Sequence, residues 1–171
     1  MIGMSLCDES IEEVYRMAVE HFDNAVFVEL GVFFGYSTVF LAKEIQRQKK
    51  KIVIHAIDRW TDQTWDARGK NVYECFIQNI KDEKVDSLIS VIKHTTHEAS
   101  MQFNGRSVDF VYIDAGHDED DIKQDINDWL PKLKHGGWIA GHDYQYAVER
   151  VVNKYFQNRV ERIKNNSWLV R

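Results

Sequence analysis

Short apolar runs alternate with helical patterns along almost the whole sequence, and this alternation constrains the fold most. Runs of strand length occupy 25–30, 51–58, 87–94, 107–114 and 137–143. Helical spacing of apolar residues appears in the segments between them, at 8–22, 39–45, 72–80, 97–103, 122–133 and 148–156. This order predicts an open, doubly wound α/β domain, with a mostly parallel sheet covered by helices on both faces.

The last third of the sequence adds two expectations. Pro131 lies late in the segment 122–133, and Gly136 and Gly137 are expected to stop that helix. The final stretch, RVERIKNNSWLVR, reads as two strands around Asn165 and Asn166, which predicts a C-terminal antiparallel hairpin. The sequence contains no linker, repeat or low-complexity stretch, so a single domain is expected over residues 1–171.

Composition removes several classes of function. The net charge of -5 gives no reason to expect a nucleic acid or an acidic membrane surface as partner. No apolar run approaches membrane-spanning length, and MIGMSLCDES lacks the layout of a signal peptide. Cys7 and Cys75 are far apart in the sequence and are expected to be free thiols. We therefore expect a cytoplasmic protein that acts on a small molecule.

The glycine loop after the first strand predicts a nucleoside-containing cofactor. Ligands of doubly wound sheets bind at the carboxyl ends of the strands, where VELGVFFGYST follows residues 25–30. Gly31 and Gly35 allow a tight turn, and the residues at the start of the helix that follows offer unpaired backbone N–H groups. Asp58, at the end of the second strand, suits a pair of ribose hydroxyls.

The identity of the cofactor follows from Glu29. The loop reads G-x-x-x-G and departs from the dinucleotide fingerprint G-x-G-x-x-G. An acid directly before the first glycine would repel a pyrophosphate but attract an ammonium, so S-adenosylmethionine is the leading cofactor. The alternative is a strand-to-helix turn without a ligand.

A second set of residues predicts a divalent metal. Asp114 ends the fourth predicted strand, and His142 and Asp143 end the fifth. If these strands are neighbours, two carboxylates and an imidazole converge, a set that suits Mg²⁺ or Mn²⁺. Such an ion lowers the pKa of a coordinated hydroxyl, and His117 is the candidate base for its proton. Asp118 to Asp121 are expected to be solvated acids at a helix start.

The segment VELGVFFGYSTVFLA resembles the first motif of class I S-adenosylmethionine-dependent methyltransferases, and is closest to the catechol and caffeoyl-CoA O-methyltransferase group. The resemblance implies a Rossmann-like fold. It implies that Glu29 meets the methionine ammonium and that Asp58 holds the ribose. Further implied cofactor contacts are Gly31, Phe33, Gly35, Tyr36, Ser37, Thr95, Thr96 and Asp114, with Phe33 and Ser37 near the methionine carboxylate and the two threonines near adenine.

The resemblance extends through VDFVYIDAGHDEDDIKQDINDWLPKLKHGGWIAGHDY and spans roughly residues 25–145. It implies metal ligands at Asp114, His142 and Asp143, and a catalytic base at His117, where a histidine is similar to macrolide sugar O-methyltransferases. The implied reaction is methyl transfer to a hydroxyl of a sugar, polyketide or phenol. The family commonly has an acid where this chain has His142, which leaves the identity of the metal and the use of a metal open.

Several alternatives remain at this stage. Asp114 could cap its strand, His117 could cap the next helix, and His142 with Asp143 could bind only loop backbone. The function could be metal-independent methyl transfer, an iron-dependent hydroxylation at Asp114, His117 and His142, or a non-catalytic module. Trp60 and Trp65 could line the substrate site or only pack. The short chain lacks an evident lid, so the site is either open or completed by a second copy in a homo-oligomer.

Overall fold

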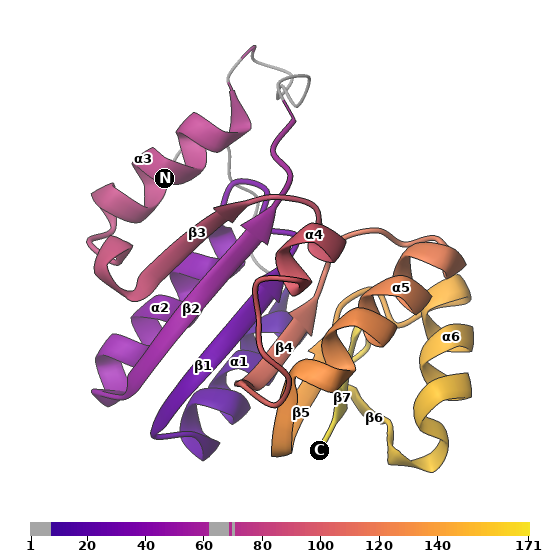
Figure 1. Ribbon diagram of the computed structural model, residues 1–171. Coiled ribbons are helices and arrows are strands. Elements are labelled where there is room, and N and C mark those ends of the chain that lie inside the picture. The colour runs from indigo at the N-terminus through magenta and orange to yellow at the C-terminus, as the bar shows by residue number, and fades with distance from the viewer. Residues whose placement is uncertain (1–7, 62–68, 70) are drawn as a thin grey trace.

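A seven-stranded sheet forms the centre of the molecule (Figure 1). The computed structural model describes residues 8–61, 69 and 71–171. The strand order is β3-β2-β1-β4-β5-β7-β6, and the first five strands in this order are parallel. The strands are Asn24–Leu30 (β1), Lys51–Asp58 (β2), Ile89–Lys93 (β3), Val108–Ile113 (β4), Leu133–Gly141 (β5), Glu161–Ile163 (β6) and Ser167–Val170 (β7).

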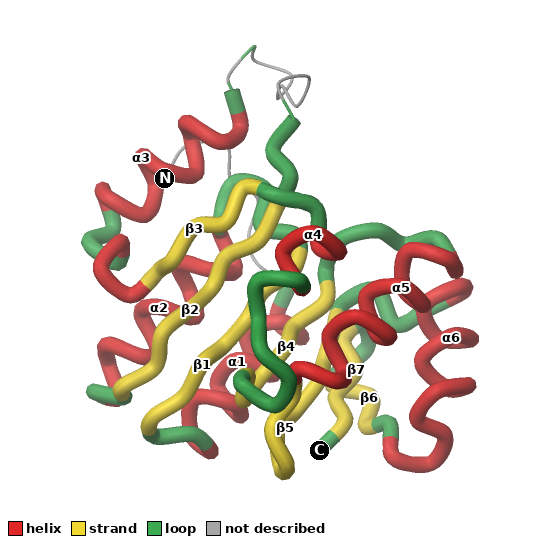
Figure 2. Tube along the Cα trace, in the orientation of Figure 1, coloured by secondary structure: helices red, strands yellow, loops and turns green. Residues whose placement is uncertain are grey.

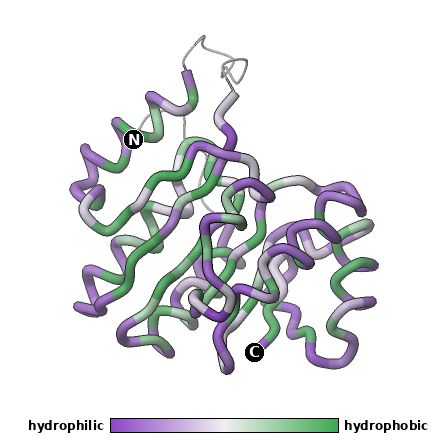
Figure 3. Tube along the Cα trace, viewed as in Figure 1, coloured by the Kyte–Doolittle hydropathy of each residue, from purple (hydrophilic) through white to green (hydrophobic). Residues whose placement is uncertain are grey.

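Helices cover both faces of this sheet, as the sequence predicts (Figure 2). One apolar core lies between the sheet and Glu9–His21 (α1), Tyr36–Gln48 (α2) and Val72–Asp82 (α3). The other core lies under Thr96–Ser100 (α4), Glu119–Trp129 (α5) and Tyr146–Phe156 (α6). Apolar residues concentrate on the strands, and polar residues on the outer faces of the helices (Figure 3). None of the helices in the described ranges is long and apolar enough to cross a membrane.

The boundary between α5 and β5 differs from the expectation. The α-helix ends at Trp129, and Pro131 lies in a short 3-10 turn, Leu130–Lys132 (η2), instead of inside the helix. Leu133 already belongs to β5 and pairs with Val108 of β4. Gly136, with φ of +77°, lies inside the strand, where the register between β4 and β5 shifts. The two glycines therefore form a bulge and do not stop a helix.

The predicted C-terminal hairpin is present, and it pairs with the parallel sheet. β7 runs antiparallel to β5 and to β6, with Asn165 and Asn166 in the turn between β6 and β7. The hydroxyls of Ser10 and Ser167 lie 2.9 Å apart, and Ser167 also contacts the hydroxyl of Tyr112 at 3.1 Å. This buried chain of hydroxyls fixes the start of α1 beside the end of the hairpin. Two further helical turns, Asp86–Leu88 (η1) and Gln157–Arg159 (η3), complete the elements.

Candidate functional site

The register of β4 and β5 brings the predicted metal ligands together. The two strands are parallel neighbours, with Ile113 opposite Gly141, so that the next residues, Asp114 and His142, leave the sheet side by side. Side chains alternate between the two faces of a strand, and Tyr112 and Ala140 belong to the core under α1. Asp114 and His142 therefore leave the sheet on the α1 side, directly above that core.

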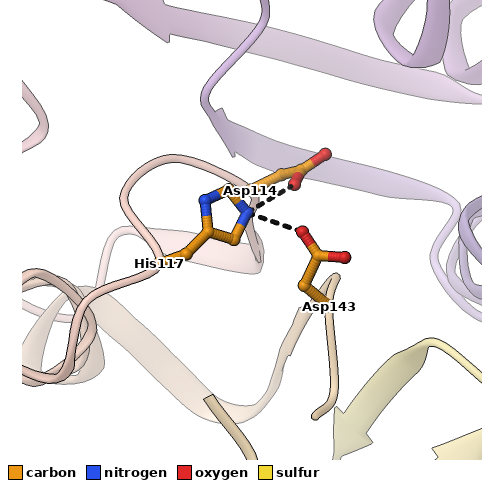
Figure 4. Close-up of side chains that lie close together, drawn as sticks. All are labelled: Asp114, His117 and Asp143. Carbon is orange, nitrogen blue, oxygen red and sulfur yellow. Dashed lines mark ion pairs between the residues drawn. The ribbon is translucent and has the colours of Figure 1, made fainter. Parts of the chain in front are cut away.

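Two aspartates and two histidines converge at this place. The Nε2 atom of His117 lies 2.7 Å from the nearest Asp143 oxygen and 3.9 Å from Asp114 (Figure 4). The Nδ1 atom of His142 lies 3.5 Å from Asp114 and 3.6 Å from Asp143. Asp114 faces both rings, so it is not merely a strand cap. The N-cap of α5 is Asp118, which argues against His117 as the cap of that helix.

The carboxylates control the charge of both imidazoles. The nearby carboxylates of Asp114 and Asp143 raise the pKa of His117 against the effect of burial. Burial alone would lower the pKa of His142, but the carboxylates of Asp114 and Asp8 overcome it and raise the pKa to about 9. Without a cation, the site therefore stabilises protonated rings. A cation bound to the same carboxylates would offset this effect.

The donor set fits a divalent cation. One ligand atom from each of Asp114, His117 and Asp143 can be chosen so that all three lie within 4.8 Å of one another. His142 presents Nδ1 to the same two carboxylates. Carboxylate oxygens suit Mg²⁺ and Mn²⁺, and imidazole nitrogens shift the preference toward Mn²⁺ or another transition metal. His117 lies close enough to Asp114 and Asp143 to serve either as a ligand or as a base beside the ligands.

A cleft of about 910 Å³ opens beside this cluster at the carboxyl edge of the sheet. Ligand pockets commonly enclose roughly 300–1,000 Å³, so the cleft has room for a nucleoside cofactor together with an acceptor. Most of the predicted cofactor residues line it: Gly31, Phe33, Tyr36, Ser37, Asp58, Thr95, Thr96 and Asp114. His142 lines it as well, so two of the three proposed metal ligands, Asp114 and His142, share one cavity with most of the proposed cofactor residues.

The glycine loop has the backbone geometry that the sequence predicts. Gly31 and Gly35 adopt φ of +83° and +79°, in the left-handed region that favours glycine. A Cβ on Gly31 would lie 2.0 Å from the carbonyl oxygen of Asp114, so only glycine allows this close approach of loop and strand. One oxygen of Asp58 accepts hydrogen bonds from the backbone N–H groups of Val32 and Phe33. The predicted ribose ligand therefore also holds the loop in place.

Glu29 lies behind the wall of the cleft. Its side chain is buried and accepts hydrogen bonds from the hydroxyls of Tyr15, Ser37 and Thr38. Burial raises its pKa to about 7, although the three hydroxyls oppose the rise. Of these hydroxyl residues, Ser37 also lines the cleft. Direct contact between Glu29 and the ammonium of a cofactor stays a prediction, and Ser37 lies between the acid and the cavity.

The end of the cleft beside Thr95 and Thr96, where adenine is predicted, contains an unexpected buried acid. Thr95 forms the capping box of α4, since its hydroxyl accepts from the N–H of Glu98 while the Glu98 carboxylate accepts from the N–H of Thr95. Asp125 on α5 lies against Thr96 and lines the same end of the cleft. Burial raises the pKa of Asp125 to about 6. Nothing in the local sequence distinguishes Asp125 from the other acids of its helix.

Of the two tryptophans that the sequence suggested for the site, the structure describes only Trp60. Trp60 is buried, stacks on Phe76 and donates from its indole N–H to the carbonyl of Phe33 at 2.9 Å. It is therefore a packing residue that supports the glycine loop. Trp65 lies outside the described residues, as does Cys7. Cys75 is a buried free thiol.

The sequence did not predict Asp8 and Asn166, the two residues that contact the Nε2 atom of His142. The carboxylate of Asp8 lies 3.2 Å from His142 Nε2, and the amide nitrogen of Asn166 lies 2.9 Å from the same atom. Asp8 is the N-cap of α1, and Asn166 is in the turn of the hairpin. The contact between Asp8 and His142 spans 134 residues, so no local pattern could reveal it.

Comparison with known proteins agrees with this arrangement. Residues 28–144 match a family described as "Methyltransferase domain". A protein of Sinorhizobium fredii described as "Uncharacterized protein y4gI" is 25% identical over 117 residues, which are 68% of this chain and 13% of that protein. The chain therefore spans about an eighth of the length of this curated relative.

Solved structures share the fold at low sequence identity. An rRNA methylase from Streptococcus thermophilus matches with a TM-score of 0.66 and 16% identity, over 97% of this chain and 96% of that chain. The O-methyltransferase NovP matches with a TM-score of 0.70 and 15% identity, over 95% and 79%. CalS11, a TDP-rhamnose 3'-O-methyltransferase of calicheamicin biosynthesis, matches with a TM-score of 0.69 and 15% identity, over 94% and 76%.

The family match covers the glycine loop, Asp58, Asp114, His117, His142 and Asp143. The chain belongs to the methyltransferase domain family and has the fold of class I S-adenosylmethionine-dependent methyltransferases.

Proposed function

We propose that the protein transfers a methyl group from S-adenosylmethionine to a hydroxyl of a small molecule, with the assistance of a divalent cation. The observation that supports this proposal is the convergence of Asp114, His117, His142 and Asp143 beside the cleft, with Asp114 and His142 in its wall. A transferase that only had to bind its cofactor would not need two carboxylates and two imidazoles at this position. The likeness to NovP and CalS11 makes a small hydroxylated acceptor the first choice.

The residues divide the work of the reaction. Asp58 and the glycine loop hold the nucleoside, while Asp114, His142 and Asp143 hold the cation. When bound, the cation lowers the pKa of a coordinated hydroxyl and orients it. His117 takes the proton through Nε2, because its half-exposed ring faces both the cation site and the solvent. The enzyme otherwise contributes the relative positions of acceptor and methyl group.

Cofactor binding is tested first, by titration calorimetry with S-adenosylhomocysteine. We expect binding to the parent and loss of binding in Asp58→Ala, which removes the ribose acceptor and the support of the loop. Asp82→Ala, at the end of α3, is the matched control and should bind as the parent does. Equal binding by the parent and Asp58→Ala would reject the assigned cofactor site.

The metal is tested separately, with a panel of sugar, polyketide and phenolic acceptors. We expect EDTA to abolish turnover, Mn²⁺ or Mg²⁺ to restore it, and Asp143→Ala to lose it. Asp120→Ala, whose side chain is 99% exposed on α5, controls for the loss of an acid elsewhere. Turnover that resists EDTA would establish the metal-independent alternative, with His117 as base. A product that gains oxygen instead of a methyl group would establish the hydroxylase alternative.

We also propose a small-molecule acceptor and not a nucleic acid, since the net charge is -5 and acids crowd the cleft. The fold is shared with rRNA methylases, so structured RNA belongs in the acceptor panel. Methylation of RNA but of none of the small molecules would overturn this choice. Light scattering on an active sample decides between an open monomeric site and one completed by a second copy.

A further inference from the structure

Both ring nitrogens of His142 contact carboxylates, and one of these carboxylates, Asp8, comes from the opposite end of the chain. Its Nδ1 atom faces Asp114 at 3.5 Å and Asp143 at 3.6 Å. Its Nε2 atom faces Asp8 at 3.2 Å. The His142 side chain is only 15% exposed, so the ring has little freedom to turn away from these partners. The two nitrogens therefore face different carboxylates: Nδ1 faces Asp114 and Asp143, and Nε2 faces Asp8.

The two oxygens of Asp8 have separate partners. Oδ1 accepts a hydrogen bond of 2.7 Å from the backbone N–H of Ser10 and so caps the start of α1. Oδ2 faces His142 and the amide nitrogen of Asn166, each at 3.2 Å. Capping needs only one oxygen, and serine or asparagine caps a helix about as well. The second oxygen of Asp8 is therefore available for a role that a capping serine could not fill.

We propose that Asp8 is a positioning residue for the cation site. It accepts a hydrogen bond from Nε2–H of His142, which leaves Nδ1 as the nitrogen that binds the cation between Asp114 and Asp143. Histidines that bind metals commonly donate their other N–H to a carboxylate, which fixes the ring and makes it a better ligand. This inference rests on the proposed metal-assisted function, and it assigns to the N-terminal helix a part in that function.

Asn166 supports the opposite arrangement of the ring proton. Its amide nitrogen lies 2.9 Å from Nε2, and donation to Nε2 would leave the proton on Nδ1, where it would prevent metal binding through that atom. The same nitrogen also lies within hydrogen-bond distance of Asp8 and Asp143. A hydrogen bond from an imidazole N–H to a carboxylate is charge-assisted and roughly twice as strong as one between neutral groups. This difference favours the proton on Nε2.

Two substitutions separate the capping role of Asp8 from its positioning role. Asp8→Ser keeps the cap but is too short to reach His142, and Asp8→Asn keeps the cap and still offers an oxygen to Nε2–H. We expect Asp8→Ser to weaken Mn²⁺ binding about 10- to 100-fold, the range typical for loss of such a partner. Asp8→Asn should recover part of the affinity. Melting temperatures near that of the parent should show that α1 remains folded.

The measurements are Mn²⁺ titration calorimetry, without cofactor or acceptor, and nitrogen NMR of the His142 ring with bound Zn²⁺. The ring spectrum should show the proton on Nε2 and the metal on Nδ1. In a His142→Asp background, Asp8→Ser should leave Mn²⁺ affinity unchanged, since no imidazole remains to be positioned.

The outcomes separate this inference from the proposed function. Equal Mn²⁺ affinity for the parent and Asp8→Ser, or a proton on Nδ1 of the metal-bound ring, would overturn the role of Asp8 while the metal-assisted reaction stands. A parent that does not bind Mn²⁺ would overturn both. Weaker binding that persists in the His142→Asp background would mean that Asp8 acts on the site by another route, and would also overturn the inference.

Discussion

Gly31 shows at the scale of one residue how the fold restricts the site. The position combines a left-handed backbone with a gap of 2.0 Å between a would-be Cβ and the Asp114 carbonyl. Gly136 has nearly the same φ, but nothing lies within 4 Å of its would-be Cβ. Alanine at Gly136 would therefore cost only the unfavourable backbone conformation, whereas alanine at Gly31 would add a steric clash.

We expect Gly136→Ala to lower the free energy of unfolding by roughly 1–2 kcal/mol, the cost of a left-handed non-glycine residue. Gly31→Ala should cost more, by a further 1–3 kcal/mol or so for the overpacking against β4. It should also weaken Mn²⁺ binding, because Asp114 must move. Urea denaturation and metal titration of both variants check this, and equal losses of stability would contradict it.

The buried Asp125 predicts a dependence of stability on pH. Its pKa is about 6 in the folded chain against 3.8 as the ordinary value. Because the pKa of Asp125 is higher in the folded chain, the folded state binds more protons than the unfolded state between pH 3.8 and about 6. The contribution of Asp125 to the free energy of unfolding is therefore lost as the pH rises through about 6. The full difference corresponds to about 3 kcal/mol at the upper end.

We therefore expect Asp125→Asn to be more stable than the parent at pH 8 by roughly 1–3 kcal/mol, with the gain vanishing near pH 4. Asp120→Asn on the exposed side of the same helix is the control. Urea denaturation at both pH values gives the result. A gain of the same size at pH 4 and pH 8 would show that charge burial is not its cause.

At the scale of elements, the alternation of strands and helices was predictable because each pattern is local. The boundary between α5 and β5 was not, because Leu133 continues the helical spacing of Ile126 and Trp129 and equally suits a strand. Its pairing with Val108 decides for the strand, and that contact is not visible in the local sequence. Because β5 begins at Leu133, Pro131 lies in the turn before the strand and Gly136 lies in the bulge within it.

The junction of α1 with the C-terminal hairpin gives a prediction at this scale. The hydroxyls of Ser10 and Ser167 form a buried contact that places the start of α1, and with it Asp8, beside the site. Ser167→Ala should cost about 1–3 kcal/mol, because the hydroxyls of Ser10 and Tyr112 lose a buried partner. The double variant with Ser10→Ala should cost less than the sum of the single variants, since each single variant already removes the same contact between the two hydroxyls. Additive losses in urea denaturation would show that the two hydroxyls are not coupled.

At the scale of the whole molecule, the site is assembled from three parts of the chain. Residues 28–144 match the methyltransferase family and supply the cofactor loop, Asp114, His142 and Asp143. The residues behind His142 lie outside this segment, Asp8 before it and Asn166 after it. Sequence motifs therefore point to residues of the central segment, most of which line the cleft or lie beside it. The residues that support them come from the two ends of the fold, where only the folded structure reveals the contacts.

Ligand binding should stabilise the whole domain if these parts form one cooperative unit. At 100 times its dissociation constant, S-adenosylhomocysteine should add roughly 2.7 kcal/mol to the free energy of unfolding. For a chain of this size, this corresponds to a rise in melting temperature of about 5–10 °C. Asp58→Asn should lose most of the rise at the same ligand concentration, while Asp82→Asn should keep it. Differential scanning fluorimetry measures all three proteins, and an equal rise in Asp58→Asn would show that the ligand stabilises the domain from a site other than the cleft.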